Sequence, residues 1–198
     1  METPSEHTMA LPDKTEREPE TEKDPFDLKK EIFEWFDAII FWASIMVLLF
    51  SFVFRVVSVD GPSMESTLYT GERLIISHLF YTPKQGDIIV ETQPNAEDKP
   101  LIKRIIALGG QTIDIDDLGN VLVDGVKIEE DYVNEAVFNG GNRKYPYTVK
   151  EGEVFVMGDN RNHSLDSRST SIGTVDVHYI LGKAYFRILP LGRFGFLK

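Results

Sequence analysis

The stretch Val59-Asp60-Gly61-Pro62-Ser63-Met64 marks the point at which this 198-residue chain changes character. Upstream, residues 38–54 carry no charge and would be apolar on every face of a helix. Downstream, apolar residues come in short runs that are rich in β-branched side chains and separated by turn signals, a pattern typical of strands. The sequence therefore predicts a helix, then a tight Gly-Pro turn that carries Ser63, then a β body.

The composition limits what the chain can do. Its net charge of −11 leaves no basic surface of the kind that binds nucleic acid, so a nucleic-acid partner is not expected. Cysteine is absent, which excludes a disulfide scaffold, a thiol nucleophile and thiolate metal ligands. The four histidines are His7, His78, His163 and His178. They lack the spacing of a metal site, so no metal and no cofactor is expected.

Residues 1–24 carry eight acids against three bases and few large apolar side chains. Such a segment cannot bury enough apolar surface to fold, and we predict a disordered acidic tail. Residues 25–57 then form the predicted membrane anchor. The charge-free run 38–54 makes a helix of about 25 Å, and its flanking aromatic and valine residues extend it to a transmembrane helix at about 36–57.

Two alternatives to an uncleaved anchor are a buried core helix and a cleaved signal peptide. The uniformly apolar helix argues against the first. The late start of the run and the lack of an A-x-A site argue against the second. Basic residues are more frequent on the N-terminal side of the run, which by the positive-inside tendency predicts a cytoplasmic N-terminus and an extracytoplasmic body. These residues are Lys14, Arg17, Lys23, Lys29 and Lys30, against Arg55 and Arg73 on the other side.

The body, residues 58–198, is predicted to be mainly β, an antiparallel barrel or sandwich. The expected strands are Leu74–Ile76, Asp87–Val90, Leu101–Leu108, Gln111–Ile115, Val121–Val123, Val126–Ile128, Tyr147–Val149, Glu153–Met157 and Lys183–Leu189. Asp124-Gly125 is a strong two-residue hairpin turn. The more polar segment 111–150 reads as a small inserted cap, or alternatively as two more hairpins of the same sheet.

Two residues suggest nucleophilic chemistry. Ser63 after Gly-Pro is by itself usually a turn residue, and Lys103 in Leu101–Leu108 could be a solvated lysine at a strand edge. A serine needs a base, and a lysine serves as one only when burial lowers its pKa far enough to leave a neutral amine. The isoleucine-rich strand around Lys103 is suited to such burial, and Ser63 lies within about 30 Å of the helix end, close to a bilayer. Met64 is expected to be exposed there, in contact with lipid or an apolar substrate.

The polar loop 158–168 offers the groups that could support such a pair. We expect Ser164 to hold the Lys103 amine by a hydrogen bond. We further expect ion pairs of Asp166 with Arg168, and of Asp159 with Arg104. An Asx-rich turn that bonds only to itself is the plainer alternative. A Ser63–His163–Asp166 triad is also conceivable, but three residues of separation make it difficult for the acid to orient the far nitrogen of the imidazole.

Five ordered blocks of this sequence resemble bacterial type I signal peptidases, which are membrane-bound Ser/Lys endopeptidases. The blocks are the apolar run, Gly61-Pro62-Ser63-Met64 with Thr67-Leu68, Gly86–Val90, Lys103–Leu108, and Met157–Arg168. The resemblance covers roughly residues 35–190. It implies Ser63 as nucleophile, Lys103 as general base and Ser164 as the hydroxyl that positions the lysine. It also implies structural support from Asp166, Arg168, Asp159 and Arg104.

The chain departs from the family pattern at three places. Ser66 stands where a proline is common, and Gly109-Gly110 replaces a Pro-Gly pair. Gly61 stands where some members place an oxyanion-hole serine, so the hole would depend on backbone N–H groups, chiefly that of Ser63.

The resemblance implies cleavage of signal peptides from exported preproteins with small residues at P1 and P3, at the outer face of the cytoplasmic membrane. The bilayer and a nearby Sec-type export machinery would be its partners. Two other hypotheses are a repressor-cleavage-type Ser/Lys self-protease and a non-catalytic, membrane-tethered module that docks or chaperones exported proteins such as pilus subunits. The apolar anchor argues against the first, and the retained Ser63 and Lys103 argue against the second.

Overall fold

The computed structural model describes residues 28–94 and 99–197. The predicted disordered tail, residues 1–24, lies outside the described residues. The chain divides into two units, residues 1–43 and 44–198, and each is described by itself. The helix α1 begins in the first unit, and the β body belongs to the second.

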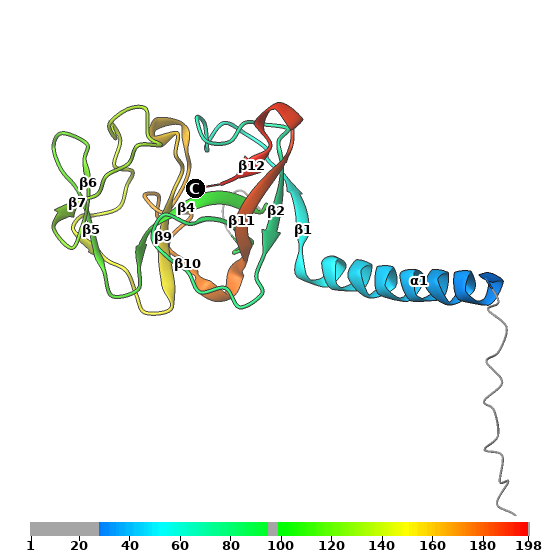
Figure 1. The fold of residues 1–198 in the computed structure, drawn as a ribbon. Helices are drawn as coiled ribbons and strands as arrows, with labels where there is room; N and C mark the ends of the chain where they lie inside the picture. The colour runs from blue at the N-terminus through cyan, green and yellow to red at the C-terminus, as the bar shows by residue number, and fades with distance from the viewer. Residues whose placement is uncertain (1–27, 95–98, 198) are drawn as a thin grey trace, which may run out of the picture. The chain divides into compact units, whose positions relative to one another are not determined.

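The helix α1 runs from Leu28 to Val53 (Figure 1). Its length of about 39 Å exceeds the ~30 Å of a hydrocarbon core. None of its residues is buried, and its most apolar window has a mean hydropathy of 2.2. Among the described residues, α1 is the one helix that is long and apolar enough to cross a membrane.

The observed helix does not coincide at either end with the transmembrane segment of about 36–57 that the sequence predicts. The helix begins earlier, at Leu28, because the Leu-Lys-Lys-Glu start consists of good helix formers. It ends at Val53, and residues Arg55–Ser58 form the strand β1, which pairs antiparallel with β2 (Arg73–Ser77). The β-branched Val56 and Val57 favour the strand, and Val57 gains contacts with the core of the body.

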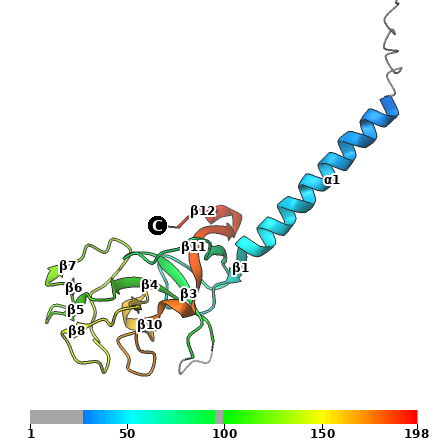
Figure 2. The same cartoon turned by 90° about the horizontal axis from the view of Figure 1, so that it is seen from below.

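Two antiparallel sheets make up the body. The larger is eight-stranded with the order β1-β2-β11-β3-β4-β9-β10, and β12 pairs with β11. Its further strands are β3 (Ile88–Glu91), β4 (Leu101–Leu108), β9 (Glu153–Met157), β10 (Val175–Asp176), β11 (Ile180–Leu189) and β12 (Gly195–Phe196). The smaller is four-stranded with the order β7-β6-β5-β8. Its strands are β5 (Thr112–Ile115), β6 (Val121–Val123), β7 (Val126–Lys127) and β8 (Tyr147–Thr148). Both views place the smaller sheet at the end of the body away from β1 and β11 (Figures 1 and 2).

The predicted fold class, a mainly antiparallel β body with one N-terminal apolar helix, is confirmed. Each predicted strand is present, with ends that differ by no more than three residues from the prediction. The predicted Asp124-Gly125 turn is also present, with both residues at positive φ (51° and 79°), as a type I′ hairpin requires. Three strands were not predicted, namely β1, β10 and β12.

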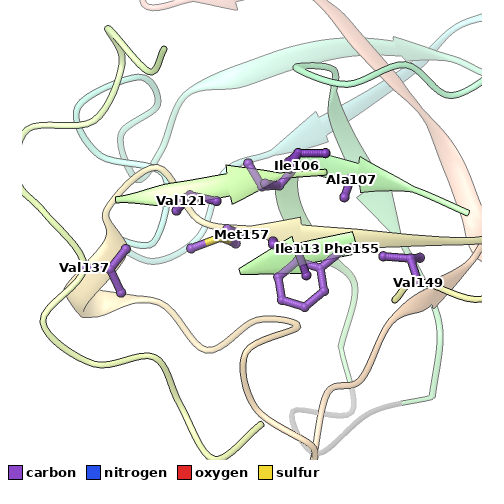
Figure 3. Packing of buried hydrophobic residues seen from close by; sticks show 9 residues of the cluster. Ile106, Ala107, Ile113, Val121, Val137, Val149, Phe155 and Met157 are labelled. Atoms are coloured by element: carbon purple, nitrogen blue, oxygen red, sulfur yellow. The ribbon is translucent and has the colours of Figure 1, made fainter. Parts of the chain in front are cut away.

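The segment 112–148 forms the smaller sheet, so the alternative that its hairpins extend the main sheet is wrong. The two sheets share a hydrophobic core (Figure 3). Ile106, Phe155 and Met157 come from β4 and β9, and they pack against Ile113 and Val121 of the smaller sheet. This shared core holds β4 and β9 in place. Lys103 lies on β4, and the polar loop 158–168 follows β9.

Candidate active site

Lys103 and Ser63 meet in the structure. The Lys103 Nζ donates a hydrogen bond of 2.8 Å to the Ser63 Oγ. Lys103 lies on β4 and is only 3% exposed, so it is not a solvated lysine at a strand edge. Burial of this kind disfavours the charged form of a lysine.

The Ser63 turn is held from both sides. On its N-terminal side the β1–β2 pairing continues past the strand, because the Val59 N–H donates to the Glu72 carbonyl at 2.9 Å. On the other side the loop after β9 holds the turn through Asn160. Its backbone N–H donates to the Ser63 carbonyl at 3.0 Å, and its side-chain amide donates to the Pro62 carbonyl at 3.1 Å.

Gly158 explains how the loop comes so close to the serine. β9 ends at Met157, directly opposite Arg104, so the chain leaves the sheet beside Lys103. A Cβ at Gly158 would lie 2.4 Å from the Ser63 carbonyl oxygen and 2.3 Å from the Ser164 Oγ. Only glycine allows these two backbones to approach in this way.

The two predicted ion pairs form, and both are buried. Arg104 binds Asp159 with two hydrogen bonds of 2.8 and 2.7 Å and donates a third bond, of 2.8 Å, to the Gly86 carbonyl. Burial opposes the charge of Arg104, but the hydrogen bonds and charge of Asp159 outweigh it and raise the arginine pKa. Thr67, four residues after Ser63, donates to the same carboxylate. The pair thus connects β4, the loop and the serine turn.

Asp166 and Arg168 form the second pair. Arg168 donates to both carboxylate oxygens of Asp166, at 2.8 and 2.9 Å. Asp166 also accepts the Gly158 N–H at 3.0 Å. Arg168 donates to the Asn139 carbonyl at 3.0 Å, so the pair connects the loop with the segment around the smaller sheet. Because this carboxylate faces Arg168 and His163 is exposed, the structure gives no support to a Ser63–His163–Asp166 triad.

Two expectations about supporting residues do not hold in detail. The Ser164 Oγ is buried and has no hydrogen-bond partner in the part of the chain that the structure describes, so the expected bond to the Lys103 amine is not formed. That amine donates to Ser63, while Ser164 lies against Gly158. Met64 is not exposed, since it is 1% accessible and packs with Leu68 in the core behind the turn.

Gly61 adopts a positive φ of 91° in the serine turn, a conformation that suits glycine. Its N–H donates to the Thr70 Oγ1 at 3.1 Å. The Gly61 N–H is therefore already engaged within the turn.

A cavity of about 360 Å³ borders Ser63 and Lys103. Its walls are mostly apolar and come from β1, β3, β4, β11 and the serine turn, with Val57, Val59, Val90, Ile102 and Leu181 among them. A larger hollow of about 630 Å³, near Ser77 and His178, contains neither Ser63 nor Lys103. The smaller cavity is the one placed to receive a substrate beside the serine.

Several contacts of the site were not expected from the sequence. Tyr132 places its ring 3.9 Å from the Arg104 guanidinium carbon, and Glu130 pairs with the buried Arg161 of the loop. Both belong to the segment 111–150, which the sequence separates from the site by turns. Glu91, at the end of β3, is fully buried on the strand next to Lys103. The sequence signal for Glu91 was that an acidic residue directly follows the apolar run Ile88-Ile89-Val90.

A single apolar helix, an antiparallel β body and a serine hydroxyl on a buried lysine amine are the features expected of a membrane-anchored serine peptidase of the Ser/Lys class. The family model for "Signal peptidase, peptidase S26" matches residues 32–189. The chain therefore belongs to the signal peptidase family, peptidase S26.

Two curated relatives support this assignment. A protein named signal peptidase I from Bacillus licheniformis is 33% identical over 186 residues, which cover 86% of this chain and 95% of the relative. A probable signal peptidase I-1 from Synechocystis sp. is 38% identical over 148 residues, 69% of this chain and 72% of the relative. A solved structure of a signal peptidase I from Enterococcus faecalis V583 is 30% identical, covers 52% of this chain and 97% of that one, and has a TM-score of 0.44.

These findings establish the activity as that of a signal peptidase I, a serine endopeptidase that cleaves signal peptides from exported preproteins. The self-protease and the non-catalytic docking module are not favoured, since the relatives are named as signal peptidases. The anchored character of the family agrees with the presence of α1.

Proposed function

We propose that Ser63 is the nucleophile and Lys103 the general base of this endopeptidase. The observation that carries the proposal is the 2.8 Å hydrogen bond between the Lys103 Nζ and the Ser63 Oγ in a buried setting. A serine needs a base within hydrogen-bond reach, and this is the distance at which a proton can pass between the two atoms.

The reaction would proceed in two halves. The neutral Lys103 amine takes the Ser63 proton as the Oγ attacks the scissile carbonyl, and the Ser63 N–H stabilises the oxyanion. The ammonium then protonates the leaving amine, which is the new N-terminus of the mature protein. An acyl-enzyme on Ser63 remains, and water activated by Lys103 hydrolyses it and releases the signal peptide.

The supporting residues act by position. Asp159 with Arg104, and Asp166 with Arg168, hold the loop and the turn at the spacing that the pair requires. Ser164 lies beside Ser63 across Gly158, where it packs against the loop backbone and makes no hydrogen bond to the lysine. Gly61 and Met64 shape the turn from the backbone and from the core behind it.

The apolar cavity beside Ser63 supports a preference for small residues at P1 and P3. The substrate would be an extended strand, since strand addition places alternate side chains in pockets along the site. The distribution of basic residues around α1 supports a cytoplasmic N-terminus and a body outside the cytoplasmic membrane, where a Sec-type machinery delivers preproteins.

The test is cleavage of a preprotein by full-length protein in membrane vesicles. We expect both Ser63→Ala and Lys103→Ala to lose activity by a factor on the order of 10⁴. Lys103→Arg should be equally inactive, because an arginine keeps its proton and cannot act as a base. Thermal unfolding serves to show that the variants fold. Near-normal processing by either alanine variant would remove the assignment.

A further inference from the structure

Glu91 and Lys103 occupy adjacent strands on the same face. The antiparallel register of β3 and β4 places Ile89 opposite Lys103 and Glu91 opposite Leu101. Residues opposite each other in such a pair share a face, and so do residues two apart on one strand. Glu91 is therefore the diagonal neighbour of Lys103, a relation that corresponds to about 7–8 Å between backbones and is within reach of two long side chains.

Only one of the two Glu91 carboxyl oxygens has a hydrogen-bond partner among the described residues. Its side chain is 0% exposed. Oε2 accepts a hydrogen bond of 2.7 Å from the Gln93 N–H, while Oε1 is buried and has no hydrogen-bond partner in the described parts of the chain. A buried carboxylate with a free oxygen is costly unless a positive charge compensates it.

Lys103 is the charged side chain that acts on Glu91 among the described residues. On β11, on the other side of β3, the facing residues are Ile180, Gly182 and Lys183, and Lys183 is paired with Asp87. The groups around Gln93 on the β10 side are backbone atoms of Thr174 and Asp176. The Asp176 carboxylate itself is paired with His178.

We propose that the Glu91 carboxylate is the counter-ion of the Lys103 amine and acts as a positioning residue that sets how readily the base loses and accepts its proton. The inference rests on the proposed Ser63–Lys103 pair and deepens it. A phenylalanine or leucine at this position would be an apolar neighbour of the lysine, whereas Glu91 is a neighbour that can carry a negative charge. The ammonium that forms when Lys103 takes the Ser63 proton would then be stabilised across the sheet.

The direction of the effect follows from the charges. Burial raises the pKa of the Glu91 carboxyl above its ordinary value, and the Gln93 N–H and the Lys103 charge offset only part of this rise. Once ionised, the carboxylate favours the ammonium form of Lys103, so it raises the pH at which the lysine becomes a base. Without that charge, Lys103 would be neutral at lower pH, but it would also be a weaker base.

The experiment is the pH profile of kcat/KM for full-length protein cleaving a preprotein-derived peptide in detergent micelles. For Glu91→Gln, which has nearly the same shape without the charge, we expect the acidic limb to move to lower pH by about one unit. The plateau rate should also fall several-fold, by about 2- to 10-fold, because the base is weaker. Glu91→Asp, which keeps the charge, should restore a limb close to the original one.

Two controls separate this effect from a loss of structure. Glu72→Gln removes another buried carboxylate, one that is paired with Arg187 and Arg193, and should leave the acidic limb in place even if stability falls. Glu91→Met replaces the carboxylate with an apolar side chain of similar length. If Glu91→Gln does not fold, the acidic limb of the pH profile of Glu91→Met provides the same test. An acidic limb that stays in place in Glu91→Gln and Glu91→Met would overturn the proposal. If Ser63→Ala and Lys103→Ala are inactive in the same assay, the Ser/Lys assignment survives that result.

Discussion

Gly158 is a position in the site where a side chain would not fit, because the neighbouring serines lie too close. The loop backbone there touches the Ser63 carbonyl and the Ser164 hydroxyl, and its N–H is bonded to Asp166. The nucleophile, the loop and the Asp166–Arg168 pair are thus joined through one residue without a side chain. A displacement of about 1 Å at a reacting group can reduce a rate by about 100-fold, so this contact is more important for catalysis than its small area suggests.

We therefore predict that Gly158→Ala reduces kcat/KM by about 100-fold or more while the protein still folds. The added Cβ would lie 2.4 Å from the Ser63 carbonyl oxygen and must push the serine away from Lys103. Overpacking should also lower the free energy of unfolding by about 1–3 kcal/mol. The matched control is Gly192→Ala, where a Cβ meets nothing within 4 Å. Equal activity in the two variants would show that the close approach is not required.

At the scale of elements, the smaller sheet takes part in building the site. Its strands share a core with β4 and β9, and the segment after β7 reaches the buried arginines of the site. Tyr132 stacks on Arg104, and its hydroxyl donates to Glu130 at 2.9 Å, which in turn pairs with Arg161. The segment thus contacts both Arg104 and the loop that carries Arg161.

Tyr132→Ala should weaken this support. Loss of the half-buried ring removes a cation–π contact worth about 1 kcal/mol and part of its packing, so we expect the free energy of unfolding to fall by about 2 kcal/mol. Cleavage at permissive temperature should fall less than 10-fold, because Asp159 still holds Arg104. Tyr132→Phe keeps the ring and should lose only about 1 kcal/mol with the hydroxyl bond. Chemical denaturation measures both, and equal stability of the two variants would show that the ring is not what matters.

Alternating apolar residues and turn signals were enough to predict most strands and the helix. They failed where pairing, and not propensity, decided the structure. Val56 and Val57 resume the apolar character after Arg55, and only the register of residues 55–58 with β2 makes them a strand. The short strands β10 and β12 have two residues each and leave little pattern to recognise.

The site shows the same division between local and long-range information. Ser63 and Lys103 could be identified from local sequence and the resemblance, since each lies in a distinctive motif. Glu130 and Tyr132 could not, because their importance depends on which strand or loop lies next to them. For Glu91 the sequence shows only an acid at the end of an apolar run, and its place beside Lys103 depends on strand register. The unmade hydrogen bond of Ser164 likewise depends on side-chain placement, which no spacing determines.

At the scale of the whole molecule, the proposed orientation places the tail and the body on opposite sides of a membrane. The absence of cysteine makes this testable by single introduced cysteines, with the unmodified chain as background control. We expect a membrane-impermeant maleimide to label Asp117→Cys, an exposed site on the body, in intact cells. Ser5→Cys in the tail should be labelled only after permeabilisation. The opposite pattern would reverse the proposed orientation.

The most direct test of the central claim is to ask which atom is acylated and what activates it. Purified full-length protein would be treated with a serine-reactive, acylating β-lactam-type probe, and the adduct would be located and timed by mass spectrometry. We predict one adduct on the peptide that contains Ser63, no adduct in Ser63→Ala, and acylation slowed by about 100-fold or more in Lys103→Ala. An adduct on another residue, or unchanged acylation without the Lys103 amine, would contradict the account.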